Sequence, residues 1–268
     1  MEFHKILVED VAHDVPVLSK DVRLAEVIRD MEKARTDRVV LTTHDKSIAG
    51  ILTKSDILVK IATERTRQSE PLSWTSSGFM TTPVHSIESS APLSEAVKLM
   101  EKHGFTSVLV HADKPRLVDR FSLAEVLFND PTPVLAVSRT PPETFSLNTR
   151  ILHARQVIFE HGISIVPVLD EEGKFIGVIG IDEVLELLLI YYESLRKSPR
   201  HLTEIRSLVV ADAIRMRPPT VSTDATLGDA ARSMIETRYR GVVVVDDNGF
   251  PAGVITGREL VSYIRSKI

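Results

Sequence analysis

Gly50-Ile-Leu-Thr53-Lys-Ser-Asp56 and Gly253-Val-Ile-Thr256-Gly-Arg-Glu259 are two copies of one pattern. In each copy, a short β-prone apolar segment runs into a threonine, and an acidic residue stands three positions further on. A hydroxyl followed by an acid at this spacing is the capping box, in which both side chains bond to free N–H groups at the start of a helix. Each stretch therefore predicts a strand that passes directly into a helix.

The segments around these stretches repeat as well. Apolar residues recur at i, i+3, i+4 and i+7 in three predicted amphipathic helices, around residues 24–31, 93–100 and 227–234, and a poorer copy at 151–158 has Arg155 at i+4. Each helix is followed by a β-prone run, at residues 39–41, 108–110, 165–169 and 242–245. A polar turn and a returning strand come next. With opening strands at 15–18, 84–87, 143–146 and 220–222, the order β-α-β-β-α occurs four times.

Four copies of this unit use almost the whole chain. The acidic landmarks after the returning strands, Asp56, Glu125, Glu183 and Glu259, are 69, 58 and 76 residues apart. We predict an α/β (α+β) fold of four units, at residues 8–67, 74–128, 129–192 and 207–268. A unit of about 67 residues buries its own sheet poorly, so we expect pairing into two modules, 1–128 and 129–268.

The composition of the 268 residues argues against several classes of protein. Lys and Arg number 33 against 37 Asp and Glu, a net charge of -4, which does not favour a protein that coats nucleic acid. There is no cysteine, which excludes disulfides, thiolate metal sites and a cysteine nucleophile. The apolar runs are too short to span a bilayer, and the N-terminus lacks the long apolar stretch of a signal peptide. We expect a cytoplasmic protein without a membrane.

Common enzyme motifs are missing from the sequence. It contains no G-x-x-x-x-G-K-[ST] phosphate loop, G-x-G-x-x-G dinucleotide turn, H-E-x-x-H metal helix or G-x-S-x-G nucleophile elbow. Four small repeats also leave few long loops from which a catalytic site could be assembled. We expect no enzymatic activity and no required metal.

The four units resemble CBS domains, named after cystathionine β-synthase, which occur in tandem pairs called Bateman modules. The resemblance covers nearly all of the chain and rests on the two stretches quoted above and on Val166-Pro167-Val168-Leu169-Asp170. A four-unit chain without a fused enzyme is similar in layout to the γ subunit of AMP-activated protein kinase and to stand-alone archaeal relatives. The resemblance implies two pseudo-twofold modules with ligand clefts between paired units.

The resemblance also implies an adenine nucleotide, AMP, ADP or ATP, as the regulatory ligand. At the corner from Thr53 to Asp56, the hydroxyl and N–H groups can hold phosphate oxygens, and the carboxylate can accept both hydroxyls of a ribose. Carried over by position, each corner faces residues of its partner unit. The candidate ligand residues are Thr53, Ser55 and Asp56 with Ile87, Thr106 and Ser107; Thr256 and Glu259 with Thr144, Ile163 and Ser164; Asp182 and Glu183 with Thr220 and Arg240; and Arg38.

Departures from the family pattern rank these sites. The Asp56 site comes first because it alone keeps Asp at the ribose position, and the Glu259 site comes second. The Glu183 site is third because Gly180 stands where a hydroxyl is expected, although Asp182 can replace Glu183 toward the ribose. The Glu125 site is last. Arg38 and Arg240 precede hairpin strands, where the family often has phosphate-binding basic residues, so we expect them to bind phosphate.

The function expected from the sequence is a non-enzymatic energy or metabolite sensor whose ligand state is passed to an unidentified regulated protein. Several alternatives stay open. The capping boxes satisfy helix N–H groups without any ligand, so the chain could be an interaction scaffold with vestigial pockets. Binding of S-adenosylmethionine or of nucleic acid is a further alternative. The two modules either form a disk within one chain or assemble as a homodimer.

Overall fold

The chain folds into four similar units, seen in a computed structural model that describes residues 2–61, 71–197 and 204–268. The predicted mixed α and β fold of four repeated units is confirmed. The predicted end of the first unit, residue 67, lies outside the described residues.

Each unit has an opening strand, a helix, a hairpin and a second helix. The first contains β2 (Val17–Ser19), α2 (Leu24–Lys33), β3 (Arg38–Thr42), β4 (Ile48–Thr53) and α3 (Lys54–Lys60). The second contains β5 (Ser86–Glu88), α4 (Leu93–His103), β6 (Ser107–His111), β7 (Arg116–Asp119) and α5 (Arg120–Val126). The third contains β8 (Phe145–Ser146), α6 (Ile151–Glu160), β9 (Ile165–Leu169), β10 (Phe175–Gly180) and α7 (Ile181–Lys197). The fourth contains β12 (Thr220–Ser222), α8 (Leu227–Thr237), β13 (Gly241–Val245), β14 (Pro251–Thr256) and α9 (Gly257–Ser266).

The opening strand of every unit runs parallel to the first hairpin strand, and the hairpin is antiparallel. Val17 of β2 lies opposite Val40 of β3, and Thr220 of β12 lies opposite Val243 of β13. A parallel connection needs a crossover element, and the amphipathic helix between the two strands supplies it. The 3.6-residue periodicity seen in the sequence thus marks the crossover helix of each unit.

Two short strands that the sequence analysis did not predict link the units in pairs. β1 (His13–Asp14), which follows the short helix α1 (Val8–Val11), pairs with β7 in the sheet of the second unit. β11 (Arg215–Met216), near the start of the fourth unit, pairs with β10 in the sheet of the third. Strands of two residues carry no alternating pattern, so periodicity does not reveal them. Backbone hydrogen bonds therefore cross between the first and second units and between the third and fourth.

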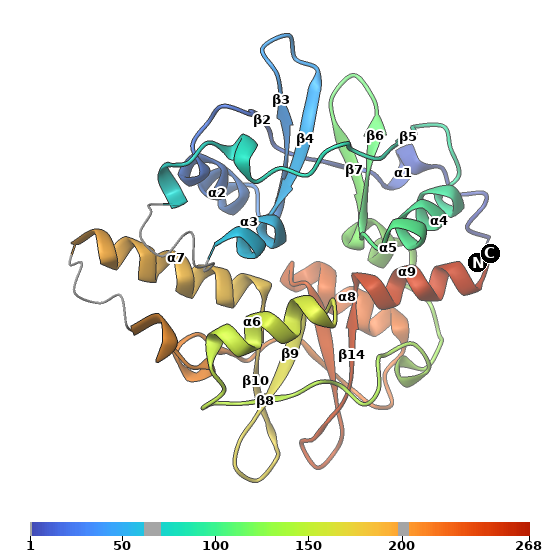
Figure 1. Cartoon of the computed structure of the whole chain (residues 1–268). Coiled ribbons are helices and arrows are strands. Elements are labelled where there is room, and N and C mark those ends of the chain that lie inside the picture. The colour runs from blue at the N-terminus through green and yellow to red at the C-terminus, as the bar shows by residue number, and fades with distance from the viewer. Residues whose placement is uncertain (1, 62–70, 198–203) are drawn as a thin grey trace.

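The two pairs of units pack against each other through their helices within one chain. Figure 1 shows the hairpins of the first two units at one side and those of the last two at the opposite side, with helices between. One apolar core joins the first and third units, and a second core joins the second and fourth. Met31, Met100 and Met234 occupy the same turn of three crossover helices and are fully buried. Burying such a side chain stabilises the fold by about 1.5–3 kcal/mol.

Candidate functional site

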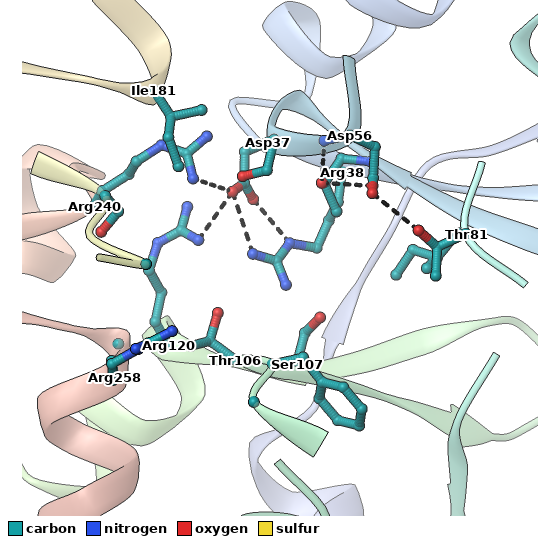
Figure 2. A pocket seen from close by; sticks show the side chains of 18 of the residues that line it. Asp37, Arg38, Asp56, Thr81, Thr106, Ser107, Arg120, Ile181, Arg240 and Arg258 are labelled. Carbon is teal, nitrogen blue, oxygen red and sulfur yellow. Dashed lines mark hydrogen bonds and ion pairs between the residues drawn. The ribbon is translucent and has the colours of Figure 1, made fainter. Parts of the chain in front are cut away.

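A cavity of about 450 Å³ lies where the four units meet. Figure 2 shows its polar wall, which combines side chains from the hairpin starts and helix starts of different units. Of the sixteen predicted ligand residues, ten line this cavity: Arg38, Thr53, Ser55, Asp56, Thr106, Ser107, Ile163, Ser164, Arg240 and Thr256. The other six are not among its lining residues: Ile87, Thr144, Asp182, Glu183, Thr220 and Glu259. The volume lies within the usual range of small-molecule sites.

The first-ranked corner, from Thr53 to Asp56, lies at the wall of this cavity. Asp56 Oδ2 accepts hydrogen bonds from the Thr53 backbone N–H at 2.8 Å and from Thr53 Oγ1 at 2.6 Å. Thr81 Oγ1, from the segment leading into the second unit, donates to Asp56 Oδ1 at 2.9 Å. The capping box is therefore formed, and it also holds the carboxylate in one orientation at the cavity wall.

A wall of rings from the second unit stands opposite this corner. His85 and Phe105 line the cavity, and their ring centroids lie 5.2 Å apart. His103 stacks on Phe105 with an interplanar angle of 5°. Gly104 ends helix α4 in the left-handed conformation, with φ of 72°, which turns the chain from His103 into Phe105. The wall offers flat surfaces beside the hydroxyls of Thr106 and Ser107.

A buried ion cluster occupies the centre of the molecule, where Asp37 meets three arginines. Asp37 Oδ1 accepts from Arg38 Nε at 2.8 Å, and Oδ2 accepts from Arg38 Nη2 at 3.2 Å and from Arg120 Nη1 at 3.0 Å. Arg240 Nη1 lies 2.8 Å from the same Oδ2. Burial by itself raises the pKa of Asp37, but the charges of Arg120, Arg38 and Arg240 outweigh burial and hold that pKa well below its usual range.

Asp182 extends this cluster into the third unit. Its carboxylate accepts hydrogen bonds from Arg240 Nε and from Arg240 Nη2 at 3.2 Å, and Lys54 Nζ lies 2.9 Å from Oδ1. Burial raises the pKa of Asp182, yet Arg240 and then Lys54 lower it to about 2. Asp182 is thus engaged by two cations and lies outside the cavity wall, in contrast to its expected position facing a ribose.

The third-ranked site has a different arrangement from the one expected. Arg240 bonds to Asp37 and Asp182, whereas Glu183 Oε1 accepts a hydrogen bond from the Tyr239 hydroxyl at 2.9 Å and lies 3.9 Å from Arg215 Nη1. The side chains of Glu183 and Tyr239 are buried, and the Arg215 guanidinium stacks over the Tyr239 ring at 4.6 Å. Burial and the nearby Asp182 raise the pKa of Glu183. The space around Glu183 is therefore filled by the protein's own side chains.

The second-ranked corner also forms a capping box. Glu259 Oε2 accepts from the Thr256 backbone N–H at 2.8 Å and from Thr256 Oγ1 at 2.5 Å, and Thr256 lines the cavity. Arg258, from the same helix start, lies against Gly162. A Cβ at Gly162 would stand 2.5 Å from Arg258 Nη2, and Gly162 has a φ of 60°, so only glycine fits there comfortably.

The acidic landmark assigned to the second unit was wrong. Helix α5 begins at the N-cap Asp119 with Ser122 three residues later, so these residues occupy the positions of Thr53 and Asp56. Glu125 lies one helical turn beyond, partly exposed, with its Oε2 3.5 Å from His13 Nε2. In α5 the N-cap residue is the acid and the hydroxyl stands three positions later, which reverses the expected order. The sequence analysis therefore placed the motif of the second unit three residues too far along the chain.

Two charged residues of the central cluster, Asp37 and Arg120, were missed from the sequence. Asp37 stands directly before Arg38, and Arg120 follows Asp119 as Lys54 follows Thr53. Aligning the four helix starts by their N-caps would have drawn attention to Arg120. The contact between Asp37 and Arg120 joins residues 83 positions apart, and no local pattern reports it.

Comparison with known proteins gives one consistent result. Four stretches match the CBS domain family, at residues 8–63, 77–129, 134–190 and 206–266. CBS domain-containing protein CBSX1, chloroplastic, from Arabidopsis thaliana is 26% identical over 129 residues, covering 42% of this chain and 55% of that protein. The uncharacterized protein MJ1404 of Methanocaldococcus jannaschii is 23% identical over 195 residues, covering 69% of this chain and 42% of that protein. The chain thus spans about half the length of these two relatives.

A solved structure matches the whole arrangement. Protein MJ1225 from Methanocaldococcus jannaschii, which has been proposed as an archaeal homologue of g-AMPK, superposes with a TM-score of 0.81. The match covers 97% of this chain and 100% of that chain at 16% sequence identity, so it shows a shared fold of four units. None of the helices in the described parts of the chain is long and apolar enough to cross a membrane.

Proposed function

Because this chain belongs to the CBS domain family, we propose that it is a regulatory protein that binds AMP, ADP or ATP in its central cavity and signals the bound state to a partner protein. The observation that carries the proposal is the convergence of the Asp56 corner and three guanidinium groups on one cavity of about 450 Å³. The modules in this proposal are residues 1–128 and 129–268.

The wall of the cavity supports each part of such a ligand. Asp56 presents an oriented carboxylate for the ribose hydroxyls, which would replace the hydrogen bond from Thr81. The rings of His85 and Phe105 offer flat surfaces for adenine. Arg120 and Arg240 lie deeper, where they suit phosphate oxygens, because guanidinium groups bind phosphate through paired hydrogen bonds.

The shared cavity also suggests how binding is signalled. Helix α3 begins at the cavity in the first unit, α5 in the second, α7 in the third and α9 in the fourth, and Ile158 and Phe159 of α6 also line it. A ligand that contacts several units favours the arrangement in which all its contacts are made. The ligand can shift the equilibrium between two arrangements of the units by no more than the difference between its binding free energies for them.

The decisive experiment is calorimetry and thermal shift with AMP, ADP, ATP, S-adenosylmethionine and adenosine. A ligand at 100 times its dissociation constant should stabilise the native state by about 2.7 kcal/mol. Asp56→Ala should abolish this shift. The matched control is Asp229→Ala, because Asp229 forms the same capping box with Thr226 at the exposed start of α8 and should leave binding unchanged.

Other results of this screen would replace the proposal. If no adenosine compound raises the melting temperature, the interaction scaffold with vestigial pockets is favoured. A response to S-adenosylmethionine alone would identify a different ligand, and binding of duplex DNA that weakens steeply with salt would indicate nucleic acid. Light scattering of the purified chain distinguishes a monomer from a homodimer.

A further inference from the structure

The cavity wall carries a small net positive charge around one buried carboxylate. The charged residues that line the cavity are two aspartates and four arginines, namely Asp37, Asp56, Arg38, Arg120, Arg240 and Arg258. Arginine stays protonated in proteins, so the formal charge of this wall is +4 − 2 = +2. Asp182 and Lys54, just outside the wall, form an ion pair and add no net charge. The cavity is therefore suited to an anion of small charge.

Asp37 already acts as the internal anion of this cluster. Its Oδ1 accepts from Arg38, and its Oδ2 accepts from Arg120 and lies 2.8 Å from Arg240 Nη1, so the contacts come from the first, second and fourth units. Figure 2 shows these guanidinium groups converging on Asp37 from different sides. Oδ2 is contacted by three guanidinium groups and Oδ1 by one, so the charge of Asp37 is surrounded by the arginines of the wall. Phosphate oxygens that reach these arginines therefore meet a fixed negative charge beside them.

Arg120 retains capacity for an external acceptor. Its side chain lines the cavity and is only 7% exposed, and its Nε is buried without a hydrogen-bond partner among the described residues. A buried donor without a partner destabilises a protein by about 1–3 kcal/mol. One further acceptor, such as a single phosphate group, would suit this guanidinium, whereas a chain of phosphates would add charge that Asp37 repels.

We propose that Asp37 sets the amount of negative charge that the cavity accepts, and that it makes the protein select an adenosine monophosphate over the corresponding di- and triphosphates. This inference rests on the proposed function, since it concerns the ligand of the same cavity. Each additional phosphate adds negative charge next to a buried carboxylate in a region of low dielectric, where repulsion is much stronger than in water. The second and third phosphates thus weaken binding.

The test compares AMP, ADP and ATP by calorimetry in the absence of divalent cations, which would mask phosphate charge. In the unmodified protein, the dissociation constant should increase from AMP to ADP to ATP. Asp37→Asn keeps the size of the side chain and one acceptor oxygen but removes its charge. We expect the ratio of the ATP to the AMP dissociation constant to fall by about tenfold or more in this variant.

A second buried aspartate supplies the matched control. Asp130 is as buried as Asp37 and bonds to Tyr263 Oη at 2.9 Å, but it is not among the residues lining the cavity. Asp130→Asn should leave the ratio within about twofold of the unmodified protein.

An unmodified protein that binds ATP as tightly as AMP would overturn the inference even if Asp37→Asn fails to fold. An Asp37→Asn variant that binds AMP with an unchanged ratio would overturn it as well. Failure of all three nucleotides to bind would instead refute the proposed function.

Discussion

The corner at Thr53 and Asp56 and the corner at Gly180 and Glu183 occupy the same position in two units, yet Asp56 lines the cavity and Glu183 does not, although Ile181 of the second corner reaches the wall. Asp56 is partly exposed and held by two threonines, whereas Glu183 is buried and held by Tyr239. The difference does not lie in the acid alone. In the first pair the small Thr81 donates to the acid, whereas in the second the large Tyr239 donates to it and the Arg215 guanidinium stacks on the Tyr239 ring.

The largest effect is expected from opening the corner at Gly180 and Glu183, called here the filled corner because Tyr239 occupies the space beside Glu183. Tyr239→Ala should lower the free energy of unfolding by about 3–5 kcal/mol, because it removes a buried ring and the hydrogen bond to Glu183. If Tyr239 is what closes this cleft, calorimetry should then detect nucleotide binding at a second site. Tyr239→Phe keeps the ring and should bind no additional nucleotide. Equal stoichiometry in both variants would mean that another feature closes the cleft.

A second change tests why the filled corner lacks a hydroxyl. At Gly180, a Cβ would stand 2.3 Å from the backbone oxygen of Ser164, so a Thr like Thr53 does not fit there without movement of the strands. We expect Gly180→Ala to destabilise the fold by about 1–3 kcal/mol in urea unfolding. Gly78→Ala is the control, because no atom lies within 4 Å of its Cβ position. A neutral Gly180→Ala variant would show that the two corners are interchangeable.

The smallest expected effect concerns the charge of Glu183. Burial raises its pKa in the folded state, so ionised Glu183 costs stability at pH values above its unfolded pKa of about 4.3. Glu183→Gln removes that charge and should raise the melting temperature at pH 8, with a smaller gain near pH 3, where the carboxyl is largely protonated in both states. An identical gain for Glu183→Gln at both pH values would contradict the assigned cause.

Much of the fold could be predicted because its signals are local. The stripe that contains Met31, Met100 and Met234 identifies three crossover helices, and the hairpins follow from β-prone runs around polar turns. The strands β1 and β11 could not be predicted in this way, because a strand of two residues carries no periodicity. The partner of β1 also lies about one hundred residues further along the chain. The landmark at Glu125 failed because Asp119 caps its helix with an acid in place of a hydroxyl.

The candidate site, like the fold, was predicted from the sequence only in its local features. Thr53, Asp56 and Thr256 belong to capping boxes, which are set by residues three positions apart, so the sequence predicted their positions at strand-to-helix corners. Arg38 and Arg240 were recognised as basic residues before hairpin strands, but their partner Asp37 was not. Long-range ion pairs depend on which units face each other, and that information is absent from any single stretch of chain.

The sequence by itself determined the four repeats, the capped helix starts and the family of this protein, because short-range periodicity and turn chemistry are written in neighbouring residues. Only the tertiary structure decided that the first unit packs on the third and the second on the fourth, that Asp37 gathers arginines from three units, and that Tyr239 fills the corner at Glu183. The physical reason is that burial and charge pairing depend on the neighbours a side chain meets after the whole chain has folded.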